Sequence, residues 1–268
     1  MNGKVFLVGA GPGDPELLTL KAARLLREAE IVLHDDLVSA EVLALVPSAA
    51  QVLNVGKRCG QKSMRQEEIH FLMIAAASQG LRVLRLKSGD PLIFGRAGEE
   101  IAALRKAGID FEIVPGVTAA LGAASAAQIP LTHRQFASAV VFVTGHEAAG
   151  GDKTDLRALV RSGATLMFYM PGRDYGEIRR RLISSGLDAE TPCALISRAS
   201  QPDQSVHVTT LNHLPDVPRA AAPSLLVVGP VVQLAHPSFS KRQVAVWARS
   251  VEQELQRLTA EQREGDLG

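Results

Sequence analysis

The stretch VFLVGAGPGDP at residues 5–15 joins a short apolar run to a glycine-rich turn. The apolar run is typical of a buried β-strand. The leucine pattern after the turn predicts a helix, with Asp14 as its N-cap and Pro15 in its first turn. The turn departs from the phosphate-binding pattern G-x-G-x-x-G, because Asp14 stands where the third glycine is required and Pro12 lacks a backbone donor. Alone, this turn fits a structural role as well as a binding role.

Short β-branched runs recur along the chain and alternate with helical patterns. The predicted strands are residues 5–8, 31–33, 51–55, 82–86, 111–114, 139–144, 165–169, 193–196, 206–209 and 225–228. This alternation predicts an α/β fold, with helices covering sheets and with sites at the carboxyl ends of the strands.

The composition of the chain changes after Pro115-Gly116, where a stretch of small residues begins. We therefore expect two α/β domains with mostly parallel or mixed sheets, residues 1–115 and 116–239. Residues 240–268 are expected to form a C-terminal helical extension, and residues 145–152 a flexible loop.

The composition excludes several classes of protein. Lys and Arg total 29 against 28 for Asp and Glu, so no net positive charge favours nucleic acid or a membrane surface as a partner. Cys59 and Cys193 lie far apart, which supports neither a metal site nor a disulfide framework. The apolar runs fall short of the roughly 18 to 20 residues that span a bilayer, and the N-terminus does not resemble a secretory signal. We expect a cytoplasmic protein.

Two further glycine-bearing loops follow predicted strands, in the same manner as the first. They read KSGDPLIFGR at residues 87–96 and PGVTAA at residues 115–120. Because loops at the carboxyl ends of parallel strands meet at one edge of a sheet, we expect the three loops to converge on one crevice.

The order and spacing of these loops resemble the tetrapyrrole methylase family, from about residue 5 to residue 232. The strings that carry the resemblance are VGAGPGDPELLTLKA at 8–22, HDDLVS at 34–39, VGKRCG at 55–60, RLKSGDPLIFGRAGEE at 85–100, VPGVTAA at 114–120, IPLTHR at 129–134, FYMP at 168–171 and SLLVVGPVV at 224–232. The resemblance implies a two-domain fold with an active-site cleft between the domains. It also implies S-adenosylmethionine-dependent C-methylation of uroporphyrinogen III at C2 and C7, giving precorrin-2 and S-adenosylhomocysteine on the way to sirohaem, cobalamin or haem d1.

The resemblance also implies a cofactor site without a metal. The matching positions are Pro12, Ser88, Gly89, Asp90, Ile93, Thr118, Ala119, Met170 and Ala199. In such a site Asp90 can accept hydrogen bonds from the cofactor, and Ile93 and Met170 offer apolar surface to adenine. The alternative for Asp90 is a turn that caps a helix.

For the chemistry, Asp35 matches the family's proton acceptor and Lys57 its proton donor. A carboxylate near the substrate ring can take the proton that is lost after methylation. The alternatives are a strand-end turn for Asp35 and a solvated basic patch for Lys57. Arg96 and Arg134 match arginines that the family places near the carboxylate-rich substrate, and Glu99 is expected to orient an arginine or a pyrrole N–H.

Other interpretations remain open. Within the family they are a later corrin-pathway methylase, a diphthine-forming enzyme or a ribosomal RNA ribose methylase, and outside it a nicotinamide oxidoreductase or a non-catalytic tetrapyrrole carrier. The resemblance and the apolar stretches at 121–129 and 227–234 also predict a homodimer.

Overall fold

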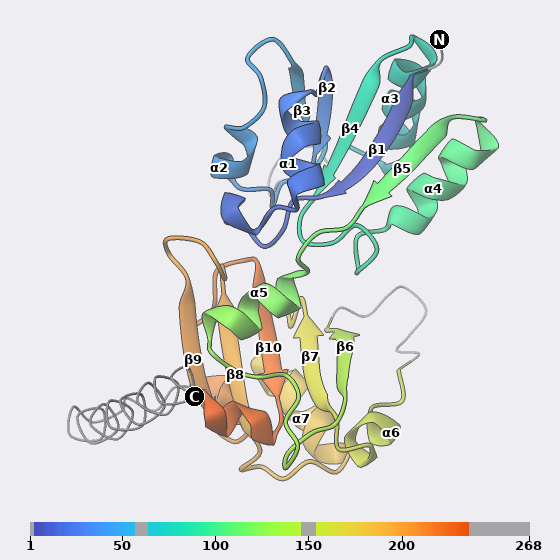
Figure 1. Cartoon of the computed structure of the whole chain (residues 1–268). Coiled ribbons are helices and arrows are strands. Elements are labelled where there is room, and N and C mark those ends of the chain that lie inside the picture. Colours follow the sequence, from blue (N-terminus) through green and yellow to red (C-terminus); the bar gives the residue numbers. More distant parts are fainter. Residues whose placement is uncertain (1–2, 57–63, 146–153, 236–268) are drawn as a thin grey trace, which may run out of the picture.

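The computed structural model of the chain describes residues 3–56, 64–145 and 154–235. They fold into two layered α/β units, each built on one five-stranded sheet (Figure 1). This confirms the predicted fold class. Each predicted strand is present, with bounds that differ by at most one residue at either end. The predicted loop at 145–152 falls almost entirely outside the described residues, and the predicted extension at 240–268 does so completely.

The first sheet is parallel throughout and has the order β3-β2-β4-β1-β5. Its strands are β1 (Lys4–Gly9), β2 (Ile31–His34), β3 (Gln51–Asn54), β4 (Arg82–Lys87) and β5 (Asp110–Val114). β1 and β4 lie at its centre, and helices cover both faces. The carboxyl ends of all five strands therefore meet at one edge.

The helices of the first unit are α1 (Leu20–Arg27), α2 (Ala40–Leu43), α3 (Gln66–Ser78) and α4 (Ala97–Lys106). α1 and α2 pack on one face of the sheet through Leu25, Leu26 and Val42. α3 and α4 pack on the other face through Ile69, Met73 and Leu104. This second face also receives alternate side chains of β4, because side chains of a strand alternate between its faces.

The helix predicted directly after the glycine turn proved wrong in one respect. Asp14 does cap a helical turn, but that turn is the short 3-10 helix Pro15–Leu17 (η1). The α-helix begins only at Leu20, where Thr19 caps it through the backbone nitrogen of Ala22. Leu18 leaves helical geometry between the two caps, so one predicted helix became two elements.

The second sheet is mixed and has the order β6-β7-β10-β8-β9. Its strands are β6 (Val140–Thr144), β7 (Thr165–Tyr169), β8 (Pro192–Ser197), β9 (Ser205–Thr210) and β10 (Ser224–Val228). Only β6 and β7 run parallel; the other neighbours are antiparallel. β10 lies between β7 and β8, which places the last strand of the described chain at the centre of the sheet.

Two apolar layers enclose this sheet. α5 (Ala119–Ala126) and η3 (Pro230–Leu234) pack on one face, while α6 (Leu156–Arg161), α7 (Tyr175–Ser184) and η2 (Leu214–Asp216) pack on the other. The stretches at 121–129 and 227–234 that motivated a homodimer lie largely in the first of these layers. Within them Leu121 and Leu234 are exposed, so their apolar character mainly serves the chain's own core.

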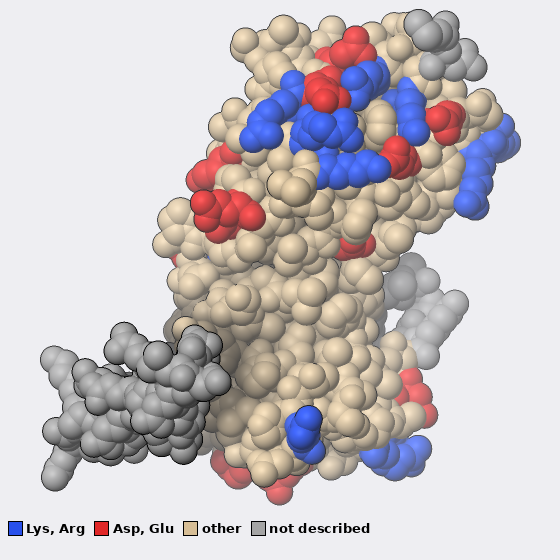
Figure 2. Space-filling view, viewed as in Figure 1, with Lys and Arg blue, Asp and Glu red and all other residues tan. Residues whose placement is uncertain are grey.

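Figure 1 shows the two sheets arranged end to end, with β1, β4 and β5 pointing toward the second unit and β6 and β7 pointing back toward the first. The strand ends of both units therefore face each other. Charged side chains of both signs gather over the first unit on the face shown in Figure 2. Its surface ion pairs include Lys4 with Glu112 and Arg82 with Glu28. None of the helices in the described ranges is long and apolar enough to cross a membrane.

Candidate functional site

The three predicted glycine loops meet at the carboxyl edge of the first sheet. Gly11 and Gly89 form an isolated β-bridge, with backbone N···O distances of 3.2 and 2.8 Å. A Cβ on Gly116 would lie 2.3 Å from the carbonyl oxygen of Gly89, and a Cβ on Gly9 would lie 2.6 Å from Cα of Gly116. The loops therefore touch backbone to backbone, and side chains at these glycines would force them apart.

The loop after β4 reaches across to the second unit. Ile93 packs against the core layer that contains α5, and the ring of Phe94 lies 4.8 Å from the ring of Tyr169, centroid to centroid. The first loop does the same, because a Cβ on Gly122 in α5 would lie 2.6 Å from Cβ of Pro12. The predicted cofactor positions Pro12 and Ile93 thus lie where the two units meet.

Tyr169, at the end of β7, fastens the start of α5. Its hydroxyl lies 2.5 Å from Oγ1 of Thr118 and accepts a hydrogen bond from the backbone nitrogen of Ala120 over 3.1 Å. The second bond satisfies one of the donors that a helix N-terminus leaves free. Burial raises the pKa of Tyr169 above its ordinary value, although the bonds with Thr118 and Ala120 oppose the shift.

Residues with positive φ cluster in the same region. Phe94, Arg96, Met170, Arg198 and Ser200 have φ between 49° and 63°. A left-handed conformation is unusual for such side chains, and strained residues of this kind concentrate at functional sites. Met170 and Phe94 are also half exposed despite being apolar, which leaves an apolar surface beside Tyr169 that a planar ligand can cover.

Asp90 has two hydrogen-bond partners in the backbone. Its Oδ1 accepts from the nitrogen of Leu92 over 2.9 Å, and its Oδ2 accepts from the nitrogen of Gly116 over 3.0 Å. The turn of the alternative interpretation is therefore present, but Asp90 caps no helix, because α4 begins only at Ala97. Each carboxylate oxygen retains a further lone pair, so a ligand can still bind at this half-buried group.

The remaining cofactor positions fall into two groups. Gly89 and Ala119 meet at the junction of the loops, since a Cβ on Gly89 would lie 3.3 Å from the nitrogen of Ala119, and Ser88 directly precedes Gly89. Ala199 is buried and belongs to the core layer of the second unit. Its side chain therefore packs inward, and the backbone of the strained segment 198–200 is the part that can face a ligand.

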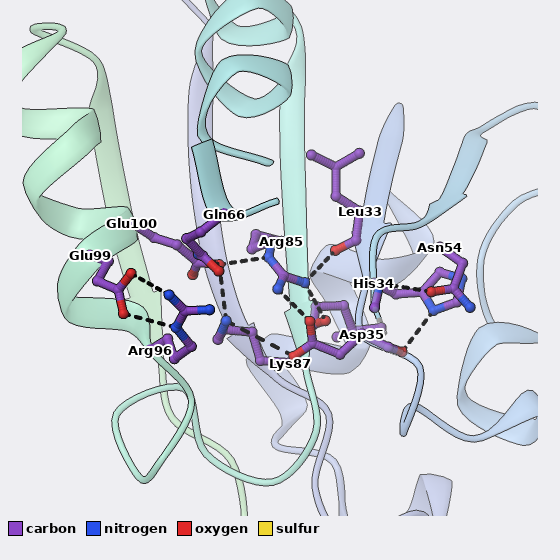
Figure 3. A network of polar contacts seen from close by, with 12 residues as sticks. Leu33, His34, Asp35, Asn54, Gln66, Arg85, Lys87, Arg96, Glu99 and Glu100 are labelled. Carbon is purple, nitrogen blue, oxygen red and sulfur yellow. Dashed lines mark hydrogen bonds and ion pairs between the residues drawn. The ribbon is translucent and has the colours of Figure 1, made fainter. Parts of the chain in front are cut away.

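Asp35 belongs to a network of charged side chains that contact one another beneath α4 (Figure 3). The guanidinium of Arg85 bonds Oδ1 of Asp35 through Nη2 and Oε1 of Glu100 through Nε, the latter over 2.9 Å. Nζ of Lys87 lies 3.0 Å from Oε1 of Glu100 and 3.9 Å from Oδ2 of Asp35. Arg85, Lys87 and Glu100 are buried, whereas the side chain of Asp35 is 29% exposed.

Burial acts on the two cations differently. It would lower the pKa of Arg85, but the Asp35 and Glu100 carboxylates outweigh it and hold that pKa above its ordinary value. In contrast, burial and the neighbouring Arg85 lower the pKa of Lys87 despite the same two carboxylates. Lys87 is therefore the cation of this group that gives up its proton more readily.

The predicted substrate residues are not all brought together. The guanidinium of Arg96 donates two hydrogen bonds to the carboxylate of Glu99, from Nε to Oε1 over 2.8 Å and from Nη2 to Oε2 over 2.6 Å. The hydrogen bond with Arg96 lowers the pKa of Glu99. Arg134 is exposed in the segment between α5 and β6, and no contact in the described part of the chain joins it to Arg96. Lys57 lies outside the described residues.

Comparison with known proteins shows which family this chain is related to. A family model described as Tetrapyrrole (Corrin/Porphyrin) Methylases matches residues 4–215. This chain belongs to the tetrapyrrole methylase family. The family match covers the strand ends, the three glycine loops and the charged group beneath α4.

Relatives of this tetrapyrrole methylase agree with the assignment. It is 51% identical over 236 residues to Siroheme synthase 1 of Yersinia enterocolitica and 50% identical over 236 residues to that of Pectobacterium atrosepticum, covering 88% of this chain in both cases. The chain spans about half the length of these relatives, 50% and 49%.

Solved structures resemble it along all or nearly all of their length. Uroporphyrin-III C-methyltransferase from Thermus thermophilus, solved with S-adenosylhomocysteine, is 43% identical with a TM-score of 0.75, covering 87% of this chain and 100% of that one. A cobalt precorrin-4 methyltransferase is 30% identical with a TM-score of 0.76, covering 85% of this chain and 95% of that one.

Sequence reasoning missed four residues of this tetrapyrrole methylase site: Arg85, Lys87, Glu100 and Tyr169. Arg85 and Lys87 lie two positions apart on a strand that is buried on both faces, where charges are costly unless paired. That spacing was a usable signal for a buried ion group. For Glu100 and Tyr169 no signal existed, because their partners Arg85 and Thr118 are 15 and 51 residues away.

Proposed function

We propose that this chain transfers methyl groups from S-adenosylmethionine to C2 and C7 of uroporphyrinogen III, giving precorrin-2. The observation that carries the proposal is the full-length match to the Thermus enzyme solved with S-adenosylhomocysteine, combined with the convergence of the three glycine loops on one crevice. The product serves sirohaem, cobalamin or haem d1 synthesis, and the siroheme synthase relatives point to the same branch of chemistry.

The cofactor fits the junction between the units. Beside the closely packed glycines lie the partly exposed residues Ser88 and Asp90, and the half-exposed Met170 offers apolar surface. Pro12, Ser88, Gly89, Asp90, Ile93, Thr118, Ala119, Met170 and Ala199 form its surroundings. When bound, S-adenosylmethionine supplies an electrophilic methyl group. The described residues contain no cluster of His, Cys, Asp or Glu that would hold a metal ion, and the proposed reaction needs none.

The chain's own residues supply orientation and proton transfer. A nucleophilic ring carbon of the substrate takes the methyl group as the bond between sulfur and methyl breaks and S-adenosylhomocysteine leaves. Positive charge then spreads over the pyrrole ring, and the substrate loses a proton. The partly exposed Asp35 carboxylate accepts that proton. Lys57 donates a proton to the ring system where its double bonds rearrange, and regains one from water. Arg96 and Arg134 bind substrate carboxylates, with Glu99 orienting Arg96 as it does through the two bonds described above.

One assay tests the function. The protein is incubated without oxygen with uroporphyrinogen III and methyl-labelled S-adenosylmethionine, and the methyl groups on the product are counted and located. Two methyl groups at C2 and C7 are expected. A parallel incubation supplies cobalt precorrin-4 instead; label on that compound but none on uroporphyrinogen III would favour the reaction of the cobalt precorrin-4 methyltransferase. Tight porphyrinogen binding without transfer would indicate a carrier.

We further propose that the chain works in the cytoplasm as a homodimer, without nucleic acid or membrane, and that its two domains divide at residue 115. Cyclic two-fold dimers are the commonest soluble assemblies. With most of the apolar stretches buried internally, the dimer has to use other exposed surface. Light scattering at micromolar concentration tests the assembly, and a monomer mass would contradict it.

A further inference from the structure

Glu100, in the first turn of α4, is an unusual residue for its position. It is fully buried, and its oxygens have unequal surroundings. Oε1 lies within hydrogen-bond distance of three donors: Nε of Arg85 at 2.9 Å, Nζ of Lys87 at 3.0 Å and Nε2 of Gln66 at 3.4 Å. Oε2 has no hydrogen-bond partner among the described residues. Such a buried ionic group is weak evidence for stability, because well-packed apolar side chains often serve as well or better.

Asp35 is the partly exposed member of this otherwise buried group of charged side chains. Both cations that contact Glu100 also face Asp35, Arg85 through Nη2 and Lys87 with Nζ 3.9 Å away. His34 on the same strand directs Nδ1 to the backbone oxygen of Asp35 at 3.0 Å rather than to its carboxylate. Asp36 points elsewhere, and its Oδ1 accepts a hydrogen bond from Nδ2 of Asn54 over 3.1 Å.

The register of the strands explains the arrangement. Val83 of β4 and Leu33 of β2 belong to the core layer beneath α3 and α4, so Arg85, Lys87 and Asp35 follow them on the same face. The Glu100 side chain comes from the first turns of α4 on that face. Two acids and two bases thus lie together at the carboxyl edge, with no net charge when all are ionised.

We infer that Arg85, Lys87 and Glu100 are positioning residues for the proton acceptor. In this arrangement Glu100 holds the two cations, and the two cations hold the Asp35 carboxylate in place at the crevice. The inference rests on the proposed function, in which Asp35 accepts a proton from the substrate. Arg85 and Lys87 face inward from a strand and are too buried to bind substrate carboxylates themselves.

A double-mutant cycle tests this dependence. Asp35→Asn should lower kcat by about 100-fold or more, and Glu100→Gln, which keeps the shape of the side chain, by about tenfold. If Glu100 acts through Asp35, Glu100→Gln should cause little further loss of kcat in the Asp35→Asn protein. Losses that multiply would overturn the inference, because they would show that Glu100 acts independently of Asp35.

The pH profile gives a second readout that a merely structural role would not move. Lys87→Met removes a positive charge beside Asp35, so protonation of the carboxylate becomes easier and the acidic limb of kcat should move to higher pH. Glu100→Gln removes a negative charge and should move the same limb to lower pH. Glu112→Gln, which alters an ion pair with Lys4 at the surface of the first unit, is the control and should leave the limb in place. Unmoved limbs, or limbs that move in the same direction, would contradict the inference.

The experiment separates two kinds of failure. Full turnover in Asp35→Asn would overturn the proposed role of Asp35 and this inference with it. Impaired Asp35→Asn together with a neutral Glu100→Gln would overturn this inference alone. S-adenosylhomocysteine affinity, measured by calorimetry, shows that each variant is folded. If Glu100→Gln does not fold, Lys87→Met takes its place in the cycle with Asp35→Asn, with the same expected lack of further loss.

Discussion

Oδ2 of Asp90 accepts a hydrogen bond from the backbone nitrogen of Gly116 over 3.0 Å. This bond ties the loop after β4 to the loop after β5, at the point where the chain leaves the first sheet for the second. The same carboxylate closes its own turn through Leu92. A single side chain therefore shapes two of the three loops around the proposed cofactor site.

Asp90→Ala should weaken S-adenosylhomocysteine binding by about 1 to 3 kcal/mol, the range for losing a hydrogen bond to a charged group. The free energy of unfolding should fall by a similar amount, because the nitrogen of Gly116 loses its acceptor. Calorimetry and urea titration measure the two. The control is Asp188→Ala, which removes a similar turn bond to Glu190 away from the loops and should leave the affinity unchanged. Wild-type affinity in folded Asp90→Ala would show that the loop does not bind the cofactor.

Arg96→Leu and Arg134→Leu should each depress methylation by about 1.5 to 3 kcal/mol in kcat/KM, with cofactor affinity nearly intact. A guanidinium offers a carboxylate two parallel donors, so lysine at either position should rescue only part of the rate. Arg180→Leu is the matched control, because Arg180 pairs with Glu177 three residues away on an exposed helix as Arg96 does with Glu99. Wild-type turnover and KM in both leucine variants would place the anion site elsewhere.

Tyr169→Phe should lower the free energy of unfolding by about 1 kcal/mol, since it removes the hydroxyl that contacts Thr118 and Ala120. It should also weaken cofactor binding, because Thr118 and Ala119 lose a fixed start of α5. Tyr175→Phe removes a comparable bond to the nitrogen of Ala220. It should cost similar stability and leave binding unaffected. If Tyr169→Phe binds the cofactor as tightly as Tyr175→Phe does, Tyr169 has no role in the cofactor site.

Cys193 should make the protein less stable at alkaline pH. Burial raises the pKa of this thiol from 9.0 to about 12. The contribution of the protonated Cys193 thiol to the free energy of unfolding is fully present below pH 9. It is lost as the pH rises toward 12, because only the unfolded chain releases the proton in that window. The loss amounts to at most about 1.4 kcal/mol per pH unit. Urea titrations of wild type and Cys193→Ala from pH 7 to 10.5 measure the difference. The difference in the free energy of unfolding between wild type and Cys193→Ala should narrow by about 1 to 2 kcal/mol over this range. A constant difference would contradict the raised pKa of Cys193.

The strands could be predicted because each carries its own local signal. Runs such as residues 225–228 are β-branched or apolar throughout and are bounded by turn residues. Their order in the sheet could not be predicted, since β10 pairs with β7 and β8 across tens of residues. The start of α1 was placed too early because two consecutive caps, Asp14 and Thr19, compete within one leucine pattern.

The site was predictable where function leaves a motif and not where it relies on packing. Asp90 stands in a recognisable loop, yet its bond to Gly116 depends on where the next strand ends. In the sequence, Glu99 and Glu100 are adjacent acids of equal appearance. The helix makes one an exposed partner of Arg96 and buries the other against Arg85 and Lys87, a distinction that depends on the exact rotation of α4 over the sheet.

The loop that carries Ile93 and Phe94 has a consequence for chimeric proteins. Although this loop is encoded within the first sheet, its tip packs against side chains of the second unit, including Tyr169. A hybrid of two homologous methylases joined at residue 115 would therefore combine a tip from one parent with a receiving surface from the other. Exchanging Ile93 and Phe94 together with the second unit would keep this contact as it is in one parent, and would leave the bridge between Gly11 and Gly89 unchanged.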